Sequence, residues 1–164
     1  MTRDEKFIRK TFTLALQSAE RGFDPFAAIL VKGGKEVAST TDHCILEADP
    51  TAHAELYLIR TYCRRNRLIS LEGYTLYCNV EPCIMCSGAI HWARLSKVVY
   101  GVSQSTLKKV SAGQPKPDCR SLINSGGSKI DVIGPVLEEE GLKVLRMHPF
   151  QSKKERFQNY WQQP

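Results

Sequence analysis

The chain has 164 residues and a formal net charge of +6, and its hydrophobic fraction of 42% is ordinary for a folded globular protein. This length suits a single domain, which we expect to span residues 1–164. No apolar run approaches the ~18 residues that cross a bilayer, and the charged N-terminus is not an apolar signal core. We therefore expect a cytoplasmic protein with no membrane partner, whose six cysteines serve as metal ligands or free thiols rather than as a disulfide framework.

The first forty residues predict a helix followed by a β-hairpin. An apolar stripe at three- and four-residue spacings predicts a helix from about residue 4 to residue 21, with Ile8, Phe12, Ala15, Leu16 and Ala19 facing the core. The apolar run 27–32 predicts a strand. Gly33-Gly34 is typical of a two-residue turn, after which residues 36–40 return antiparallel.

Two further helices are predicted to begin near prolines. Asp49 and Pro50 have the residue types of an N-cap and a first helical position, and this helix runs to about residue 63 or 64. Glu81 and Pro82 begin a second helix that runs to about residue 93. Strands at 74–79, 97–100 and 130–133 alternate with these helices and with another at 135–145, loops fill most of 103–129, and a final helix or tail begins at 149. This alternation predicts an α/β sandwich with a mixed sheet.

Three side chains in these helix starts have the spacing of metal ligands. Cys83 and Cys86 form a C-x2-C pair, and His53 lies 30 residues upstream. Three protein ligands leave a fourth zinc position open for water, as in catalytic sites. The alternative is two core thiols and a satisfied histidine, but the H-x-E sequence and the adjoining prolines favour one catalytic Zn²⁺ per chain. Glu55, two residues after His53, is then the expected proton shuttle rather than a carboxylate that merely stabilises a helix end.

Three stretches of the chain resemble the cytidine deaminase-like superfamily, and within it the guanine deaminase and tRNA adenosine deaminase branch. They are residues 25–31, 49–55 and 81–90, and the resemblance covers roughly the first hundred residues. It implies a three-layer α/β/α sandwich with a mixed five-stranded sheet, and a zinc-dependent hydrolytic deaminase with Glu55 as its catalytic residue. It also implies that the backbone N–H groups of Ala54 and Cys83 contact the reacting oxygen.

Four side chains are candidates for contact with the substrate. Phe26 and Trp92 could each stack on a flat base, although aromatic side chains more often pack in the core; guanine deaminases carry tryptophan at the position of Trp92. Asp42 stands where the resembling enzymes carry asparagine, and an ionised aspartate only accepts hydrogen bonds. It would suit a donor such as a ring N–H or a ribose hydroxyl, or else be a solvated turn residue. Asp118 resembles an acidic residue that guanine deaminases place near their substrate.

The sequence leaves several substrates open. A small purine, most of all guanine or a purine nucleoside, is favoured by the motifs around residues 25, 49 and 91. A tRNA wobble adenosine deaminase agrees with the basic charge, but Asp42 and the absence of a lysine- and glycine-rich loop at 103–113 disfavour it. A cytosine-type deaminase and a non-catalytic zinc-binding module remain as further alternatives. The resemblance also implies a homodimer, with residues 149–164 packing on or swapping with the partner subunit.

Overall fold

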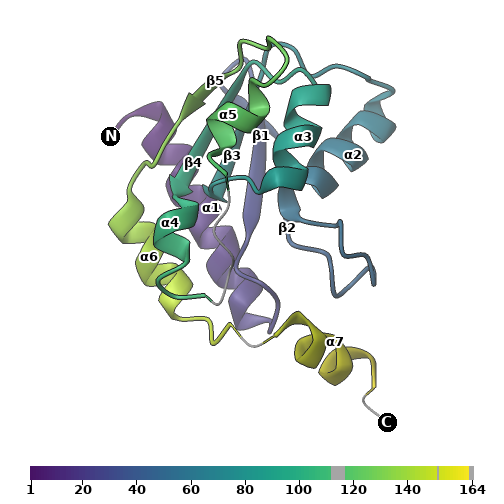
Figure 1. Cartoon of the computed structure of the whole chain (residues 1–164), viewed down its shortest axis with the longest axis vertical. Helices are drawn as coiled ribbons and strands as arrows, with labels where there is room; N and C mark the ends of the chain where they lie inside the picture. The colour runs from purple at the N-terminus through teal and green to yellow at the C-terminus, as the bar shows by residue number, and fades with distance from the viewer. Residues whose placement is uncertain (112–116, 151, 163–164) are drawn as a thin grey trace.

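The architecture is a mixed five-stranded sheet with helices on both faces, which confirms the predicted fold (Figure 1). This computed structural model describes residues 1–111, 117–150 and 152–162. The strand order is β2-β1-β3-β4-β5; β1 pairs antiparallel with β2 and β3, whereas β3, β4 and β5 run parallel. The strands are β1 (Ala27–Lys32), β2 (Lys35–Thr41), β3 (Tyr74–Val80), β4 (Lys97–Val102) and β5 (Asp131–Ile133).

Each face of the sheet has its own layer of helices and its own hydrophobic core. On one face, α1 (Arg3–Glu20) and α6 (Glu138–Arg146) cover a core that includes Phe7, Ile8, Phe12 and Leu145. On the other face, α2 (Ala54–Asn66), α3 (Ile84–Trp92) and α5 (Cys119–Ile123) cover a core that includes Leu30, Leu58, Leu76, Ile90 and Val98. Because β1, β3 and β4 are covered on both sides, their sequences are apolar almost throughout rather than alternating.

Both helices that follow the motif prolines begin later than the sequence suggested. Asp49 does not cap α2, because its carboxylate accepts hydrogen bonds from Thr51 N at 2.8 Å and Thr51 Oγ1 at 2.7 Å and holds a local turn. His53 takes the N-cap position of α2, and Cys83, rather than Glu81, precedes the first turn of α3. The metal-ligand candidates His53 and Cys83 therefore occupy equivalent places at two helix starts.

The segment from 103 to 129 is less irregular than the sequence indicated. It contains two short helices, α4 (Gln104–Leu107) and α5, each capped by a side-chain oxygen, of Ser103 and Asp118 respectively. Residues 114–116, part of an expected loop, lie outside the described residues. The helix expected from 135 begins only at Glu138, whose carboxylate accepts hydrogen bonds from Ser103 N and Oγ. This contact ties the start of α6 to the end of β4.

The C-terminal residues form a helix, α7 (Lys153–Trp161), that packs on its own chain. It lies beyond the end of the sheet, beside the loop that follows β2 (Figure 1). Trp161 Nε1 donates to the carbonyl oxygen of Ile45 at 2.7 Å, and Tyr160 meets Phe23 edge-on at 5.6 Å between ring centroids. None of the described residues of α7 is buried. No helix in the described part of the chain has the length and apolar character needed to cross a membrane.

Candidate active site

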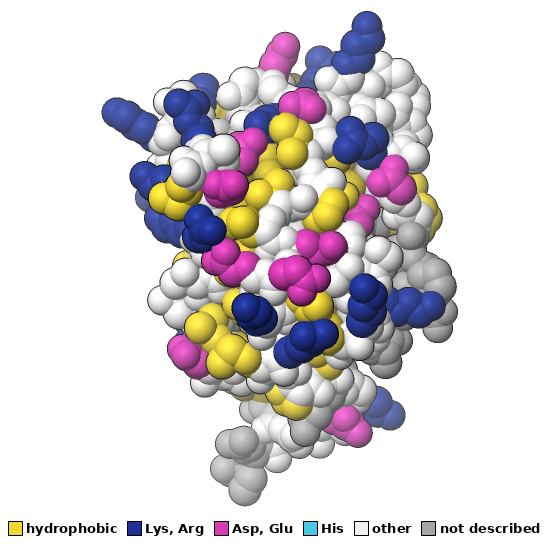
Figure 2. Space-filling model, turned by 90° about the vertical axis from the view of Figure 1, so that its left-hand side faces the viewer, with side chains coloured by type: hydrophobic (Ala, Val, Ile, Leu, Met, Phe, Trp, Pro, Cys, Tyr) yellow, Lys and Arg dark blue, Asp and Glu magenta, His cyan; other side chains and the backbone are white. Residues whose placement is uncertain are grey.

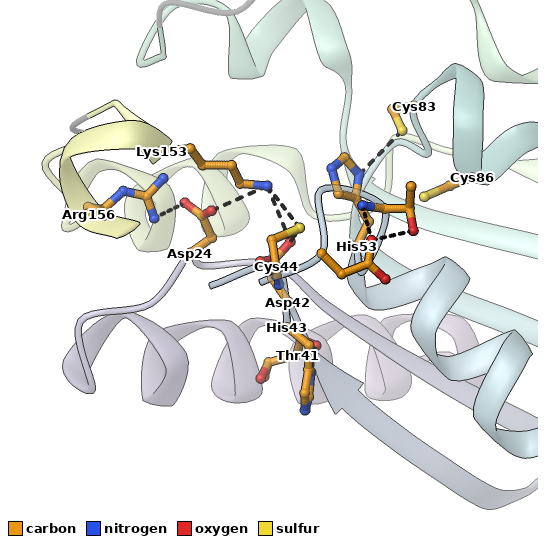
Figure 3. Close-up of polar contacts among 12 residues, drawn as sticks. Asp24, Thr41, Asp42, His43, Cys44, His53, Cys83, Cys86, Lys153 and Arg156 are labelled. Atoms are coloured by element: carbon orange, nitrogen blue, oxygen red, sulfur yellow. Dashed lines mark hydrogen bonds and ion pairs between the residues drawn. The ribbon is translucent and has the colours of Figure 1, made fainter. Parts of the chain in front are cut away.

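The starts of α2 and α3 bring the three predicted ligands together at the ends of β3 and β4. His53 Nδ1 lies 3.4 Å from Cys83 Sγ, and the ligand atoms of His53, Cys83 and Cys86 all lie within 4.8 Å of one another (Figure 3). Strands β2 and β3 run in the same direction, because each pairs antiparallel with β1, so α2 and α3, which follow them, begin at the same edge of the sheet. The two helix N-termini converge with their positive dipole ends toward the cluster, which favours thiolates there.

The donor set of this cluster fits zinc. Two ligands ~2.0 and 2.3 Å from one tetrahedral centre stand about 3.5 Å apart, close to the observed 3.4 Å between His53 Nδ1 and Cys83 Sγ. The hydrogen bond with Cys86 lowers the pKa of the Cys83 thiol to about 3 against the opposing effect of burial, and it raises the pKa of Cys86. One thiolate is thus already favoured before a metal binds, and two sulfurs with one imidazole are typical ligands of Zn²⁺.

Glu55, in the first turn of α2, is buried next to the cluster. Its Oε2 accepts a 3.5 Å hydrogen bond from Cys86 Sγ, and only 9% of the residue is exposed. Burial raises the pKa of the Glu55 carboxyl, although the neighbouring His53 opposes the shift. A carboxyl with a raised pKa beside a metal-ligand cluster is suited to accept and return a proton.

A cavity of about 270 Å³ opens over these residues. Its wall is formed by Phe26, Asp42, His53, Glu55, Val80, Glu81, Cys83, Gln104, Leu107 and Lys153. The segment that carries Phe26 is held by buried Asn79, whose Oδ1 accepts from Ala27 N at 2.7 Å and whose Nδ2 donates to Pro25 O at 2.8 Å. Phe26 is therefore a firmly placed aromatic wall of the cavity, and its stacking on a base stays a prediction.

Asp42 is part of the cavity wall and is not a solvated turn residue. It is only 4% exposed, and its Oδ1 accepts the backbone N–H of Cys44 at 3.0 Å. Its Oδ2 lies 3.7 Å from Lys153 Nζ (Figure 3). The carboxylate that replaces the amide of the resembling enzymes thus faces a cation from the other end of the chain.

Lys153 is the residue that sequence reasoning missed most completely. Its Nζ lies 3.7 Å from Asp24 Oδ2 as well as from Asp42 Oδ2, and it donates to Cys44 Sγ at 3.2 Å. Arg156, one turn along α7, pairs with Asp24 at 2.6 Å (Figure 3). The sequence offers only weak hints of these contacts, namely the acidic residues Asp24 and Asp42. No sequence pattern pairs them with Lys153 and Arg156, which lie more than a hundred residues further along the chain.

Glu81 was expected only to begin a helix, but it joins three segments around the cavity. Its two carboxylate oxygens accept the backbone N–H groups of Gln104 at 2.8 Å and Cys119 at 3.0 Å. The starts of α4 and α5 are thereby held against the loop that leads to Cys83. Gln104, which also lines the cavity, owes its position to this contact.

Three of the predicted substrate-contact residues lie outside the residues that line the cavity. Trp92 is 81% exposed at the far end of α3, about two and a half turns from Cys83. Asp118 is exposed and caps α5, where its carboxylate accepts from Ser121 N and Oγ at 3.0 Å each. Ala54 is buried as the first residue of α2, so its backbone N–H belongs to the helix start that adjoins the cluster.

Comparison with known proteins shows the family of this chain. Residues 1–102 match the family model described as the cytidine and deoxycytidylate deaminase zinc-binding region. A probable cytosine deaminase of Schizosaccharomyces pombe is 30% identical over 145 residues, covering 85% of this chain and 88% of that protein. The chain therefore belongs to the zinc-binding cytidine and deoxycytidylate deaminase family, and it is an enzyme of the deaminase class, a hydrolase of C–N bonds.

Two other relatives have different named substrates. The guanine deaminase of Bacillus subtilis is 38% identical over 102 residues, covering 62% of this chain and 65% of that protein. An X-ray structure of guanine deaminase from B. subtilis matches with a TM-score of 0.59 at 29% identity, covering 93% of this chain and 98% of that one. A tRNA-specific adenosine deaminase of B. subtilis is 33% identical over 146 residues, covering 85% and 84% of the two chains. These matches confirm the predicted branch of the superfamily. Because the relatives are named for different substrates, they do not identify the substrate of this chain.

Proposed function

We propose that this protein is a zinc-dependent aminohydrolase that replaces an exocyclic amino group of a purine base or nucleoside, guanine most of all, with a carbonyl oxygen and releases ammonia. One zinc ion per chain would be held by His53, Cys83 and Cys86. The observation that carries the proposal is the juxtaposition of this ligand cluster with buried Glu55 in the wall of one cavity. The non-catalytic alternative leaves the burial and position of Glu55 unexplained.

The size and lining of the cavity support a single heterocyclic base. Its volume of about 270 Å³ falls below the ~300–1,000 Å³ usual for drug-sized ligands. Phe26 supplies a flat apolar wall, while Asp42, Gln104 and Lys153 supply polar groups that can fix the orientation of a ring. A base or a small nucleoside fits this combination of one aromatic face and a few convergent polar groups.

The residues of the site divide the work of hydrolysis. A bound zinc ion supplies Lewis-acid activation of water at neutral pH. Glu55 would take one proton from the attacking water and deliver it to the ring nitrogen next to the carbon under attack; it would then take the proton of the newly added hydroxyl and give it to the amine, which leaves as ammonia as the carbonyl forms. The raised pKa of Glu55 suits these transfers, because the protonated carboxyl is more easily formed and can hold a proton between donor and acceptor. Phe26 would hold the ring by stacking, and Ala54 N–H would orient the reacting oxygen.

A tRNA wobble adenosine deaminase is the second candidate, supported by the B. subtilis relative and by the net charge of +6. Figure 2 shows one large face on which Lys and Arg side chains alternate with Asp and Glu. The ion pair of 3.1 Å between Arg9 and Glu140, which joins α1 to α6, is an example of such mixing. The positive charge is not gathered on that face into the continuous patch that would follow a phosphate backbone. A cytosine-type substrate, as in the S. pombe relative's name, is the third candidate.

A screen for ammonia release separates these candidates. The zinc-loaded chain would be assayed with guanine, adenine, cytosine, their nucleosides and an anticodon stem-loop, with the Glu55→Gln variant as the inactive control. We expect release from guanine or a purine nucleoside at the highest kcat/KM. Activity confined to the stem-loop would support the tRNA function, and activity confined to cytosine would support the third candidate.

We also propose a homodimer. Exposed Ile84 and Trp92 on α3 support it, because they leave apolar surface uncovered in the single chain at 61% and 81% exposure. In such a dimer Trp92 would pack against the partner rather than reach the cavity of its own chain. Light scattering of the full chain tests this: a mass near 18.5 kDa would contradict the proposal, and about twice that mass is expected.

A further inference from the structure

Lys153 is held in the cavity wall with hydrogen-bonding capacity left over. Its ammonium group has three N–H donors. One points to Cys44 Sγ at 3.2 Å, but the nearest oxygens of Asp24 and Asp42 both lie 3.7 Å away, beyond hydrogen-bonding distance. Within the described residues, the two carboxylates therefore hold the charge of Lys153 without occupying its remaining donors. A ligand in the cavity can take them.

The position of Lys153 is built into the fold. It is the first residue of α7, whose N-cap Ser152 and third residue Glu155 form a capping box with hydrogen bonds of 3.2 Å in both directions. Arg156 fastens the same turn to buried Asp24 at 2.6 Å. Burial works against the charged lysine, but attraction to Asp42 and Asp24 raises its pKa above the ordinary value, so the group enters the cavity as a cation.

We propose that Asp42 and Lys153 together recognise the lactam edge of an oxopurine: Asp42 accepts the ring N–H, and Lys153 donates to the adjacent carbonyl oxygen. This inference rests on the function proposed above and names the feature of the substrate that the cavity selects. The two groups line the same cavity as Glu55, and their charged atoms stand side by side (Figure 3). An edge with a donor next to an acceptor is complementary to this acceptor and donor.

The pair also explains what aspartate can do where an asparagine would otherwise serve. An amide offers one donor group and one acceptor from a single neutral side chain. Dividing the two roles between a carboxylate and an ammonium makes both hydrogen bonds charge-assisted and therefore stronger. An adenine ring has no carbonyl and no adjoining ring N–H, so it would offer neither charged group a hydrogen-bonding partner on the substrate, at a substantial cost. The pair thus disfavours adenosine, including that of an anticodon.

The test compares guanine with 2-aminopurine in wild-type protein and in Lys153→Met. Both purines carry the same reacting amino group at C2, but 2-aminopurine lacks the carbonyl at C6 and the N–H at N1. The ratio of the two kcat/KM values is measured within each protein, so it does not depend on the fraction of each preparation that is folded. Lys154→Met is the matched control, because Lys154 is the next residue of the same helix but, unlike Lys153, does not line the cavity.

We expect Lys153→Met to lower the guanine to 2-aminopurine ratio by about 10- to 100-fold, the range for one charged hydrogen bond, and Lys154→Met to leave it unchanged. Asp42→Asn should lower the ratio as well while zinc content stays at the wild-type level. A wild-type enzyme that deaminates guanine but whose ratio survives Lys153→Met would overturn this inference alone. A zinc-loaded wild-type chain inert on both purines would instead overturn the proposed function, and the inference with it.

Discussion

The floor and the rim of the cavity are built differently. The floor is the ligand cluster together with Glu55, at the starts of α2 and α3: His53, Glu55 and Cys83 line the cavity, and buried Cys86 completes the cluster. The rim consists of Asp42 and of Lys153 on α7, a helix with no buried residue among those described. The floor is fixed by the core, whereas the rim is fixed by a few ion pairs. In the proposed function, the floor carries out the hydrolysis and the rim selects the substrate.

Loss of a thiolate from the floor is the largest expected effect. Cys83→Ala or Cys86→Ala should abolish both zinc binding and turnover, because two remaining ligands hold zinc poorly. Elemental analysis of the purified variants measures the first effect, and ammonia release the second. Cys63→Ala is the control, since Cys63 is partly exposed on α2 and outside the cluster. A Cys83→Ala or Cys86→Ala variant that turns over at the wild-type rate without metal would show that catalysis does not need the ligand cluster.

Replacement of Glu55 should separate metal binding from catalysis. Glu55→Gln keeps the size of the buried side chain but cannot accept a proton, so we expect kcat to fall by ~10²–10⁴-fold with zinc retained. Glu47→Gln, at an exposed carboxylate that accepts a hydrogen bond from Tyr57, should behave like wild type. Equal rates for Glu55→Gln and wild type would show that another group moves the proton.

Removal of α7, and with it the Lys153 part of the rim, should weaken turnover while sparing the floor. A chain that ends at Pro149 lacks α7, and with it Lys153 and the Trp161 contact to Ile45. We expect kcat/KM for guanine to fall by about 10–100-fold, as for loss of a charged hydrogen bond, while zinc content stays constant. Light scattering on the same protein tests whether α7 also supports the proposed dimer. Full activity in the truncated chain would contradict the role of the rim.

An ion pair at the opposite end of the sheet should affect stability alone. Asp4 accepts hydrogen bonds from Lys97 Nζ at 2.8 Å and Tyr77 Oη at 2.7 Å; burial opposes the ionised form, but these contacts lower the pKa of Asp4. Because the folded-state pKa is lowered, the stabilisation is complete above the ordinary value near 3.8 and is lost as pH falls through the lowered value. Asp4→Asn should cost ~0.5–1 kcal/mol at pH 7 in denaturant titrations, less at pH 2, with turnover unchanged. A change in turnover would show that the two ends of the sheet are coupled.

The floor could be predicted from the sequence because its residues lie in two short motifs. Local spacing, with the H-x-E and C-x2-C patterns, named all four residues; the alternation of strands and helices predicted an α/β sandwich with a mixed sheet, and the family resemblance implied its three layers. The start of α2 was placed too early because Asp49 accepts hydrogen bonds from Thr51 rather than capping the helix, a choice between two local hydrogen-bonding patterns that the residue types alone do not decide.

The rim could not be predicted in the same way. Asp42 drew attention only as a departure from the resembling enzymes, and its partner Lys153 lies in a polar helix without a motif. Trp92 looked suitable for stacking on a base because of its residue type, but α3 directs it to the surface. Contacts between charged side chains distant in sequence depend on how α7 packs, and a local pattern contains no information about that packing.

The deamination of guanine by the zinc-loaded wild-type chain, followed as ammonia release at low and at physiological salt, tests the central claim most directly. The account predicts turnover whose kcat/KM changes by less than about tenfold between the two salts, because a small purine has no phosphates to neutralise. No ammonia from guanine or any small purine, together with salt-sensitive deamination of an anticodon stem-loop, would contradict it.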